Sequence, residues 1–142
     1  MKTSTFRLLL IASLVVLALG VTTQVQAQTV VKCNVPFAFS LGGQAFPSGE
    51  YSFTIGNGSG SKIVLLRNWD GSKARFLQAG VEDGSNSADT LVRFKRYGDH
   101  YLLSSLSVAG VANSLQFTPT RAERERMIRA DRSEVVSVMA SR

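Results

Sequence analysis

The chain has 142 residues, of which 44% are hydrophobic, and it carries a formal net charge of +6 with one cysteine and one histidine. A single cysteine excludes an internal disulfide. A zinc centre needs three or four clustered His, Cys, Asp or Glu ligands. One histidine and one cysteine make such a cluster improbable, so we expect no metal site. The length fits a single domain.

The N-terminal segment has the three-part layout of a secretory signal peptide. Lys2 and Arg7 flank a short basic start, an uncharged apolar run follows at 8–20, and the chain then becomes polar with small residues. Val25 and Ala27 are the small residues that a signal peptidase requires before its cut, which predicts cleavage after Ala27.

Cleavage there makes residues 1–27 a signal peptide and residues 28–142 one small exported domain, periplasmic or extracellular. The alternative is a retained membrane anchor, but the apolar run is shorter than the roughly 20 residues that a spanning helix needs, so we expect no stable membrane span. The leader holds two basic residues and no acid, which leaves the mature chain at about +4. Export and this mild charge argue against nucleic acid and favour an anionic polymer, or an envelope or extracellular protein, as partner.

Alternation of apolar and polar residues with period two dominates the mature chain and predicts half-buried strands. The first four strands are expected at 31–39, 50–55, 62–67 and 73–79. Pro36 cannot donate a ladder hydrogen bond, so the first strand should lie at a sheet edge or carry a bulge. Cys33 falls on its apolar face, which favours a buried thiol over an intermolecular disulfide. The polar segments 56–61 and 80–89 are predicted loops.

The clearest unit is a β-hairpin over residues 90–108, with Gly98-Asp99 as its two-residue turn. This turn sets a register in which the facing pairs are Tyr97 with His100, Arg96 with Tyr101, Lys95 with Leu102, Phe94 with Leu103, Arg93 with Ser104 and Val92 with Ser105. Side chains alternate between the two faces. The expected core face holds Val92, Phe94, Tyr101 and Leu103, with Arg96 at its rim. The face expected mainly in solvent holds Arg93, Lys95, Tyr97, His100, Leu102 and Ser104.

The C-terminal part predicts one helix among uncertain strands. Thr120 and Glu123 form a capping box, so a helix should run over residues 121–130. The segment 110–116 is either a loop or a short strand, and 134–140 is either a last strand or a disordered end. Together these elements predict an all-β fold of about seven short strands with one short C-terminal helix, arranged as an antiparallel sandwich or a partly open barrel.

Four segments, taken together and in this order, resemble an uncharacterised family of small exported bacterial proteins. They are Asn34-Val35-Pro36-Phe37-Ala38-Phe39, Pro47-Ser48-Gly49-Glu50-Tyr51, the nine residues from Arg96 to Ser104 (RYGDHYLLS), and Thr120-Arg121-Ala122-Glu123-Arg124-Glu125. The resemblance spans most of the mature chain. It implies an exported β domain, and it transfers no activity, cofactor or catalytic residue.

Candidate catalytic and cofactor sites are weak. His100 is the only histidine, so acid–base chemistry of the usual kind would pass through it. Ser104 lies four residues further along the same strand, about 13 Å away at roughly 3.3 Å per residue, whereas a nucleophile and its base lie about 3 Å apart. The glycines in 56–61 precede neither a helix nor a Lys-Ser/Thr pair, so a phosphate cradle is not supported. We expect no catalytic residue, no cofactor, and a solvent-facing His100.

The remaining candidates are basic side chains on two elements, proposed as an interaction surface. They are Arg93, Lys95 and Arg96 on the hairpin and Arg121 and Arg124 on the helix. Such residues attract anionic partners. The alternative is a solvated helix face held by pairs of opposite charge one turn apart.

These observations favour an exported, non-enzymatic β domain that binds or scaffolds in the cell envelope or outside the cell. Two alternatives stay open. One is an enzyme, hydrolase-like, with an unfamiliar site, which predicts a deep pocket lined by polar groups. The other is a self-assembling structural protein that associates through the edge at Pro36 or through the C-terminal tail.

Overall fold

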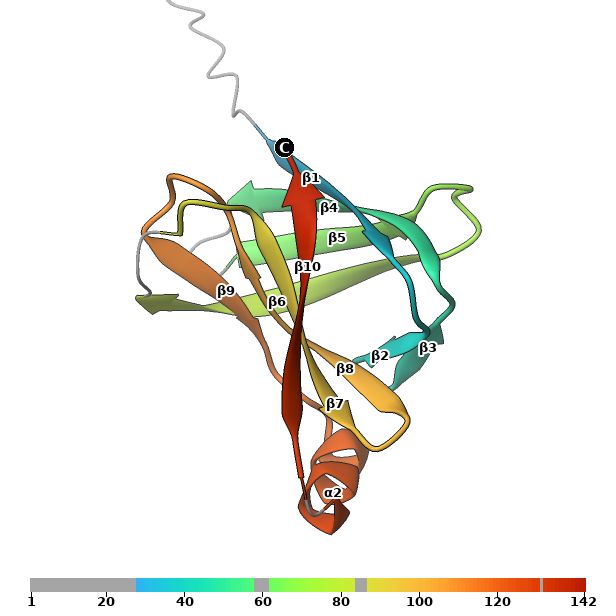
Figure 1. The fold of residues 1–142 in the computed structure, drawn as a ribbon. Coiled ribbons are helices and arrows are strands. Elements are labelled where there is room, and N and C mark those ends of the chain that lie inside the picture. Colours follow the sequence, from blue (N-terminus) through green and yellow to red (C-terminus); the bar gives the residue numbers. More distant parts are fainter. Residues whose placement is uncertain (1–27, 58–61, 84–86, 131) are drawn as a thin grey trace, which may run out of the picture.

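The computed structural model describes residues 28–57, 62–83, 87–130 and 132–142. The expected signal peptide at 1–27 and part of each predicted loop at 56–61 and 80–89 lie outside the described residues. Ten strands and one helix make up the described chain (Figure 1). They are β1 (Thr29–Val35), β2 (Phe39–Leu41), β3 (Gln44–Phe46), β4 (Gly49–Asn57), β5 (Lys62–Asn68), β6 (Ala74–Asp83), β7 (Leu91–Tyr97), β8 (His100–Ser107), β9 (Asn113–Phe117), α2 (Arg121–Arg129) and β10 (Glu134–Ser141).

Eight strands close into a barrel in which every neighbouring pair is antiparallel. The order around the ring is β8, β7, β10, β1, β4, β5, β6 and β9, and β9 pairs with β8 to complete it. β2 and β3 form an additional hairpin, attached by a parallel pairing of β2 with β8. The prediction of an antiparallel all-β fold with one C-terminal helix is confirmed. The fold is a barrel, its ring is closed, and it has more strands than the seven or so that local patterns indicated.

Alternation along each strand builds the core. In β1, Val31, Cys33 and Val35 are buried, and the side chains between them point to solvent. The largest fully buried side chains are Phe46, Phe53, Phe94, Leu66, Leu103, Leu106, Val31, Val35, Val64 and Val92. The predicted burial of Cys33 is confirmed, and burial raises the pKa of its thiol to about 12. The thiol is therefore protonated and unreactive at neutral pH.

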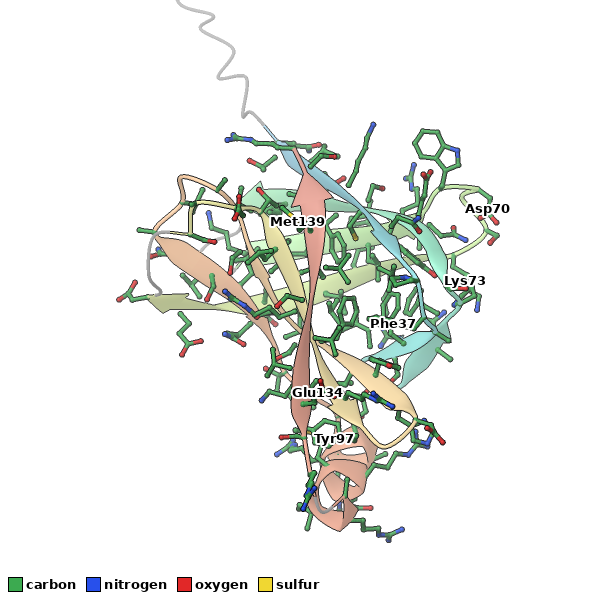
Figure 2. All side chains as sticks on the ribbon, viewed as in Figure 1. Phe37, Asp70, Lys73, Tyr97, Glu134 and Met139 are labelled. Atoms are coloured by element: carbon green, nitrogen blue, oxygen red, sulfur yellow. The ribbon has the colours of Figure 1, made fainter. Side chains whose placement is uncertain are left out.

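The first strand ends earlier than its alternation indicated. β1 stops at Val35, because Pro36 has no N–H to donate and a fixed φ angle. The chain then crosses to β2 at Phe39. β1 pairs with β4 on one side and with β10 on the other, so the prediction that Pro36 marks an edge strand is wrong. Phe37, labelled in Figure 2, lies on this crossing and stacks on Tyr101 with 3.9 Å between ring centroids.

An aromatic cluster joins the β2–β3 hairpin to the barrel. Phe39 of β2 lies 5.3 Å from Phe46 of β3, 5.1 Å from Tyr51 of β4 and 5.2 Å from Phe94 of β7, measured between ring centroids. Such ring pairs contribute about 0.5–1.5 kcal/mol each beyond the burial of their surface. Phe39 therefore ties a short hairpin, which would not be stable alone, to two strands of the ring.

The register predicted for the β7–β8 hairpin is confirmed from the turn as far as Phe94. Beyond that point it is wrong, because Ser104 has no ladder partner and β8 is shifted by a β-bulge. The shift places Leu106, rather than Ser105, opposite Val92. Leu106 is fully buried, so the bulge keeps an apolar side chain in the core at a place where strict alternation would have turned a serine inward.

The face of this hairpin that was expected mainly in solvent is covered in one place. Leu102 is only 7% exposed, although it points out of the barrel and does not belong to the main core cluster. β2 pairs beside it through Ser40, and α2 lies next to the hairpin turn (Figure 1). The covering elements come from distant parts of the chain, so alternation within the hairpin could not indicate them.

Three segments that local patterns left open or assigned to loops are strands. β6 continues to Asp83, so the loop predicted at 80–89 begins later than expected. β9 occupies part of the segment 110–116, and β10 occupies the tail. In each case the strand is stabilised by pairing with a distant partner: β6 with β9, and β10 with both β7 and β1.

The predicted capping box is confirmed and has an additional role. The Thr120 side chain accepts a hydrogen bond from the Glu123 N–H at 3.3 Å, and the Glu123 carboxylate accepts one from the Thr120 N–H at 2.7 Å. Glu123 is only 5% exposed, and its second oxygen accepts a hydrogen bond from the Gly43 N–H at 2.9 Å. Gly43 has φ 81° in the turn of the β2–β3 hairpin, a conformation that favours glycine. The Glu123 carboxylate therefore caps the N-terminus of α2 and holds the β2–β3 hairpin against it by a hydrogen bond.

Replacing Glu123 by alanine should destabilise the fold. The change removes the acceptor for two backbone N–H groups in partly buried surroundings, which should lower the free energy of unfolding by about 3 kcal/mol. Urea denaturation followed by circular dichroism measures the difference. Glu125→Ala is the matched control on the same helix, because Glu125 forms only an exposed pair with Arg121 and should cost less than about 0.5 kcal/mol. Equal stability of the two variants would contradict the role of Glu123.

Candidate functional site

Trp69 is the only tryptophan of the chain, and its side chain is 70% exposed. It follows the last residue of β5, at the start of the turn that leads to β6. Its backbone is fixed, because its N–H donates to the Glu50 carbonyl of β4 at 2.9 Å. The indole is thus an exposed side chain on an anchored backbone.

Hydrogen bonds within the turn hold this position. The buried Asn68 side chain donates to the Ser72 hydroxyl at 2.9 Å and accepts from the Lys73 N–H at 3.0 Å. The Asp70 carboxylate accepts from the Ser72 N–H at 2.8 Å. These bonds to Ser72 hold the pKa of Asp70 below its ordinary value. Gly71 has φ 73°, which a residue with a side chain rarely adopts.

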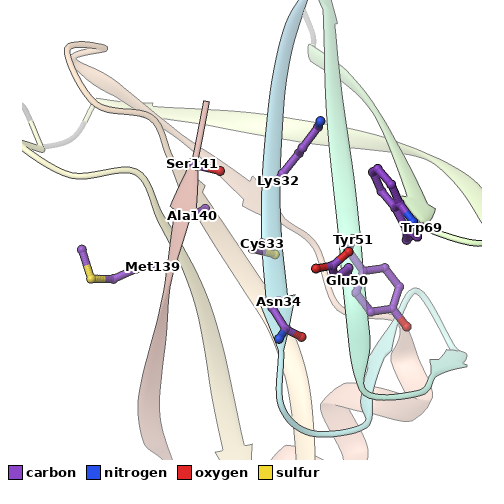
Figure 3. A pocket seen from close by; sticks show the side chains of 9 residues that line it. All are labelled: Lys32, Cys33, Asn34, Glu50, Tyr51, Trp69, Met139, Ala140 and Ser141. Atoms are coloured by element: carbon purple, nitrogen blue, oxygen red, sulfur yellow. The ribbon is translucent and has the colours of Figure 1, made fainter.

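Trp69 stands between two hollows on the outer surface of the barrel. The larger has a volume of about 570 Å³ and crosses β10, β1 and β4, and the smaller has a volume of about 240 Å³ and lies on the turn side. We call the larger one the Trp69 groove, and its polar, aromatic and thioether wall consists of Lys32, Asn34, Glu50, Trp69, Met139 and Ser141. Figure 3 shows Met139 and Trp69 at opposite sides of the groove, with β1 and β4 between them.

The groove combines an aromatic surface with hydrogen-bonding groups of both kinds. The Lys32 ammonium lies 5.6 Å from the centroid of the Trp69 ring, within cation–π range. Asn34 and Glu50 face each other across the β1–β4 ladder and are both exposed. Lysine and amide nitrogens donate, and the carboxylate and amide oxygens accept. This set can bind an uncharged ligand that has many hydroxyl groups.

The basic residues singled out from the sequence are distributed over different faces. Arg93 and Lys95 lie on the outer side of β7, and the Arg93 guanidinium donates to the Ser107 hydroxyl at 2.9 Å. Arg96 lies on the opposite side of the strand, as predicted, where its guanidinium carbon is 5.7 Å from the Tyr101 ring centroid. It also forms a 3.7 Å ion pair with Glu134.

The two helix residues proposed from the sequence are both exposed. Arg121 pairs with Glu125 at 3.1 Å, which is the opposite-charge pairing expected on a solvated helix face. Arg124 is exposed between them. The arginines of this helix that line a hollow are instead Arg126 and Arg129, next to the hairpin turn.

Local patterns missed the groove because its members come from four separate segments. Lys32 and Glu50 were placed correctly on the outer side of strands, but nothing local indicated that they meet Trp69 and Met139. One signal was available: Trp69 falls between the strands predicted at 62–67 and 73–79, where a large aromatic side chain has no strand face on which to be buried.

The described residues were also compared with the requirements of a metal site, of histidine chemistry and of a membrane-spanning helix. There, no three His, Cys, Asp or Glu side chains are grouped so that they could hold a metal ion. His100 is exposed at the start of β8, as expected for the end of a hairpin. Within the same part of the chain, no helix has the length and apolar character needed to cross a membrane.

Acid should loosen the turn that carries Trp69. Because the folded-state pKa of Asp70 is depressed below 3.8, its carboxylate stabilises the turn fully above that value, and the contribution is lost as the pH falls through the folded-state pKa. We expect the fluorescence of Trp69 to be constant above about pH 4 and to change below it. The Asp70→Asn variant should lack this step. An identical acid transition in both proteins, with unchanged circular dichroism, would contradict the assignment.

Comparisons of the chain with protein-family models, with curated proteins and with solved structures found no match in any of the three. The resemblance to a family of small exported bacterial proteins therefore stays a prediction. The residues of the Trp69 groove have to be interpreted from their own chemistry.

Proposed function

We propose that this protein is an exported, non-enzymatic β-barrel domain that binds a polysaccharide in the cell envelope or outside the cell, through the Trp69 groove. The observation that carries this proposal is the exposed Trp69 indole on an anchored backbone, between two hollows lined by polar side chains. Ligand sites typically combine aromatic side chains with a small number of placed polar groups, as this groove does.

The chemistry of a sugar ring matches the groove. A pyranose presents C–H groups on its flat sides and hydroxyl groups around its edge. The flat side stacks on an indole, and the hydroxyls exchange hydrogen bonds with amide, carboxylate and ammonium groups such as those of Asn34, Glu50 and Lys32. Hollows lie on both sides of Trp69, so a chain of sugars can continue past the indole from one hollow into the other.

Asp70 adds an acceptor to the smaller hollow. Hydrogen bonds from Ser72 lower the pKa of its carboxyl group. It is therefore an ionised acceptor, which suits the binding of a hydroxyl group.

Export is the second part of the proposal, and residues 1–27 support it through their basic, apolar and polar order. A polysaccharide partner is available in the envelope and outside the cell. A domain closed into a ring by hydrogen bonds, with its cysteine thiol buried, is suited to an oxidising compartment.

Replacing Trp69 by alanine should strongly weaken polysaccharide binding. Loss of a stacked indole typically weakens binding about tenfold or more. Affinity electrophoresis in native gels that contain xylan, laminarin, dextran or hydroxyethyl cellulose measures it as retardation of the protein. Phe76→Ala is the matched control, because Phe76 is an equally exposed aromatic residue, 73%, on β6 and outside the groove.

Retardation of wild type and Phe76→Ala, but not of Trp69→Ala, would support the groove. Retardation of none by any of the four polysaccharides, or equal retardation of all three proteins, would overturn it.

Expression of the full chain in a bacterium should give a mature protein that begins at Gln28. Intact-mass spectrometry of the periplasmic and culture fractions measures this directly. Ala27→Glu should prevent the cut, because the signal peptidase site accepts only small residues there. A wild-type protein that keeps residues 1–27, or that stays in the cytoplasm, would contradict export while leaving the test of the groove intact.

A further inference from the structure

A second hollow lies between α2 and the β7–β8 turn, away from the Trp69 groove. Its volume is about 330 Å³, and the side chains that matter below are Tyr97, His100, Leu102, Arg126, Met127 and Arg129. We call it the helix–hairpin cleft. It shares no lining residue with the Trp69 groove.

The floor of the cleft is apolar. Leu102 points out of the barrel and is nevertheless 7% exposed, and the half-buried Met127 of α2 lies over the same region. β2 forms a wall beside them through Ser40. Leu102 closes the bottom of the cleft, and the half-buried Met127 supplies most of the apolar surface that a ligand can reach.

The rim of the cleft is cationic. Arg126 and Arg129 are three residues apart and so lie on the same side of α2, and His100 faces them from the hairpin. Within the described residues neither arginine has an ion pair or a side-chain hydrogen bond. Burial raises the pKa of Tyr97, so its hydroxyl keeps its proton and can donate.

The carboxylate that lines the cleft is already engaged. Glu123 is this residue, and its oxygens accept hydrogen bonds from Gly43 and Thr120. Asp99 is exposed at the tip of the hairpin turn, outside the set of lining residues. Among the described residues, no carboxylate therefore competes with an anion from solution for the two arginines.

We propose that the helix–hairpin cleft binds an anionic amphiphile, with the anionic head on Arg126 and Arg129 and the apolar chain on Leu102 and Met127. The arginines supply paired N–H donors for a carboxylate, sulfate or phosphate group. The apolar floor then selects a head group that carries an alkyl chain over a free inorganic anion, because burial of each CH₂ contributes to binding. The site is independent of the polysaccharide groove.

Titration of the ¹⁵N-labelled mature protein with decanoate, observed by NMR, tests the cleft. We expect the amide signals of Gly98, His100, Leu102 and Ala130 to shift, and acetate at the same concentration to leave them unchanged. Flotation with phosphatidylglycerol vesicles, compared with phosphatidylcholine vesicles, then separates a lipid in a bilayer from a dissolved amphiphile as its source. Binding in either arm supports the cleft, and binding in neither overturns it.

Two double variants of equal charge provide the decisive comparison. Arg126→Gln with Arg129→Gln removes the rim, whereas Arg121→Gln with Arg124→Gln removes the same charge from the exposed side of the helix. We expect about tenfold weaker binding in the first and no change in the second. Equally weakened binding in both double variants would mean that net charge alone attracts the ligand, and it would overturn the proposal. Circular dichroism confirms folding, and Trp69→Ala should bind decanoate like wild type, which keeps this test separate from that of the groove.

Discussion

Closure of the ring by β10 is the constraint on which the rest of the molecule depends. β10 pairs with β7 along Glu134 to Met139 and then with β1 at Ala140 and Ser141, so it joins two strands that would otherwise have open edges. Closure gives every strand of the ring a neighbour on both sides, and the pairing of β10 with β1 covers two residue pairs. It also sets the position of the Trp69 groove, because one wall of that groove is β10 and the others are β1 and β4.

The two proposed binding surfaces share one property: each is presented by backbone that hydrogen bonds hold in place. Trp69 is presented by a turn whose hydrogen bonds run through Asn68 and Glu50, and the arginines of α2 are presented by a helix that Glu123 anchors to the β2–β3 hairpin. Preorganisation of this kind lowers the entropy cost of binding, because the protein backbone does not have to become ordered when a ligand binds. Both surfaces use side chains that point out of the barrel, while the inward set is committed to packing.

Local sequence patterns predicted the strands well and their partners poorly. Period-two alternation located most strands, and the Gly98-Asp99 turn set the hairpin register until the bulge at Ser104, where burial of Leu106 prevailed over strict alternation. The tail and the segment around β9 stayed undecided, because each becomes a strand only through pairing with distant residues. The same limit applies to the sites: the capping box around Glu123 was visible locally, whereas its bond to Gly43 and the meeting of Lys32 with Trp69 depend on the fold.

The pairing of the first strand with the last has a consequence for synthesis. Lys32 pairs with Ser141, so all the residues between them must leave the ribosome before the ring can be closed. Contacts between residues so far apart in sequence form late, because a long loop has to be ordered first. Until then β1 and β7 each lack a neighbour, and a nascent chain is prone to associate with other chains through them. The export that we propose would benefit from this delay, since a chain must be unfolded to pass through a translocation channel and the barrel closes only after its last strand has formed.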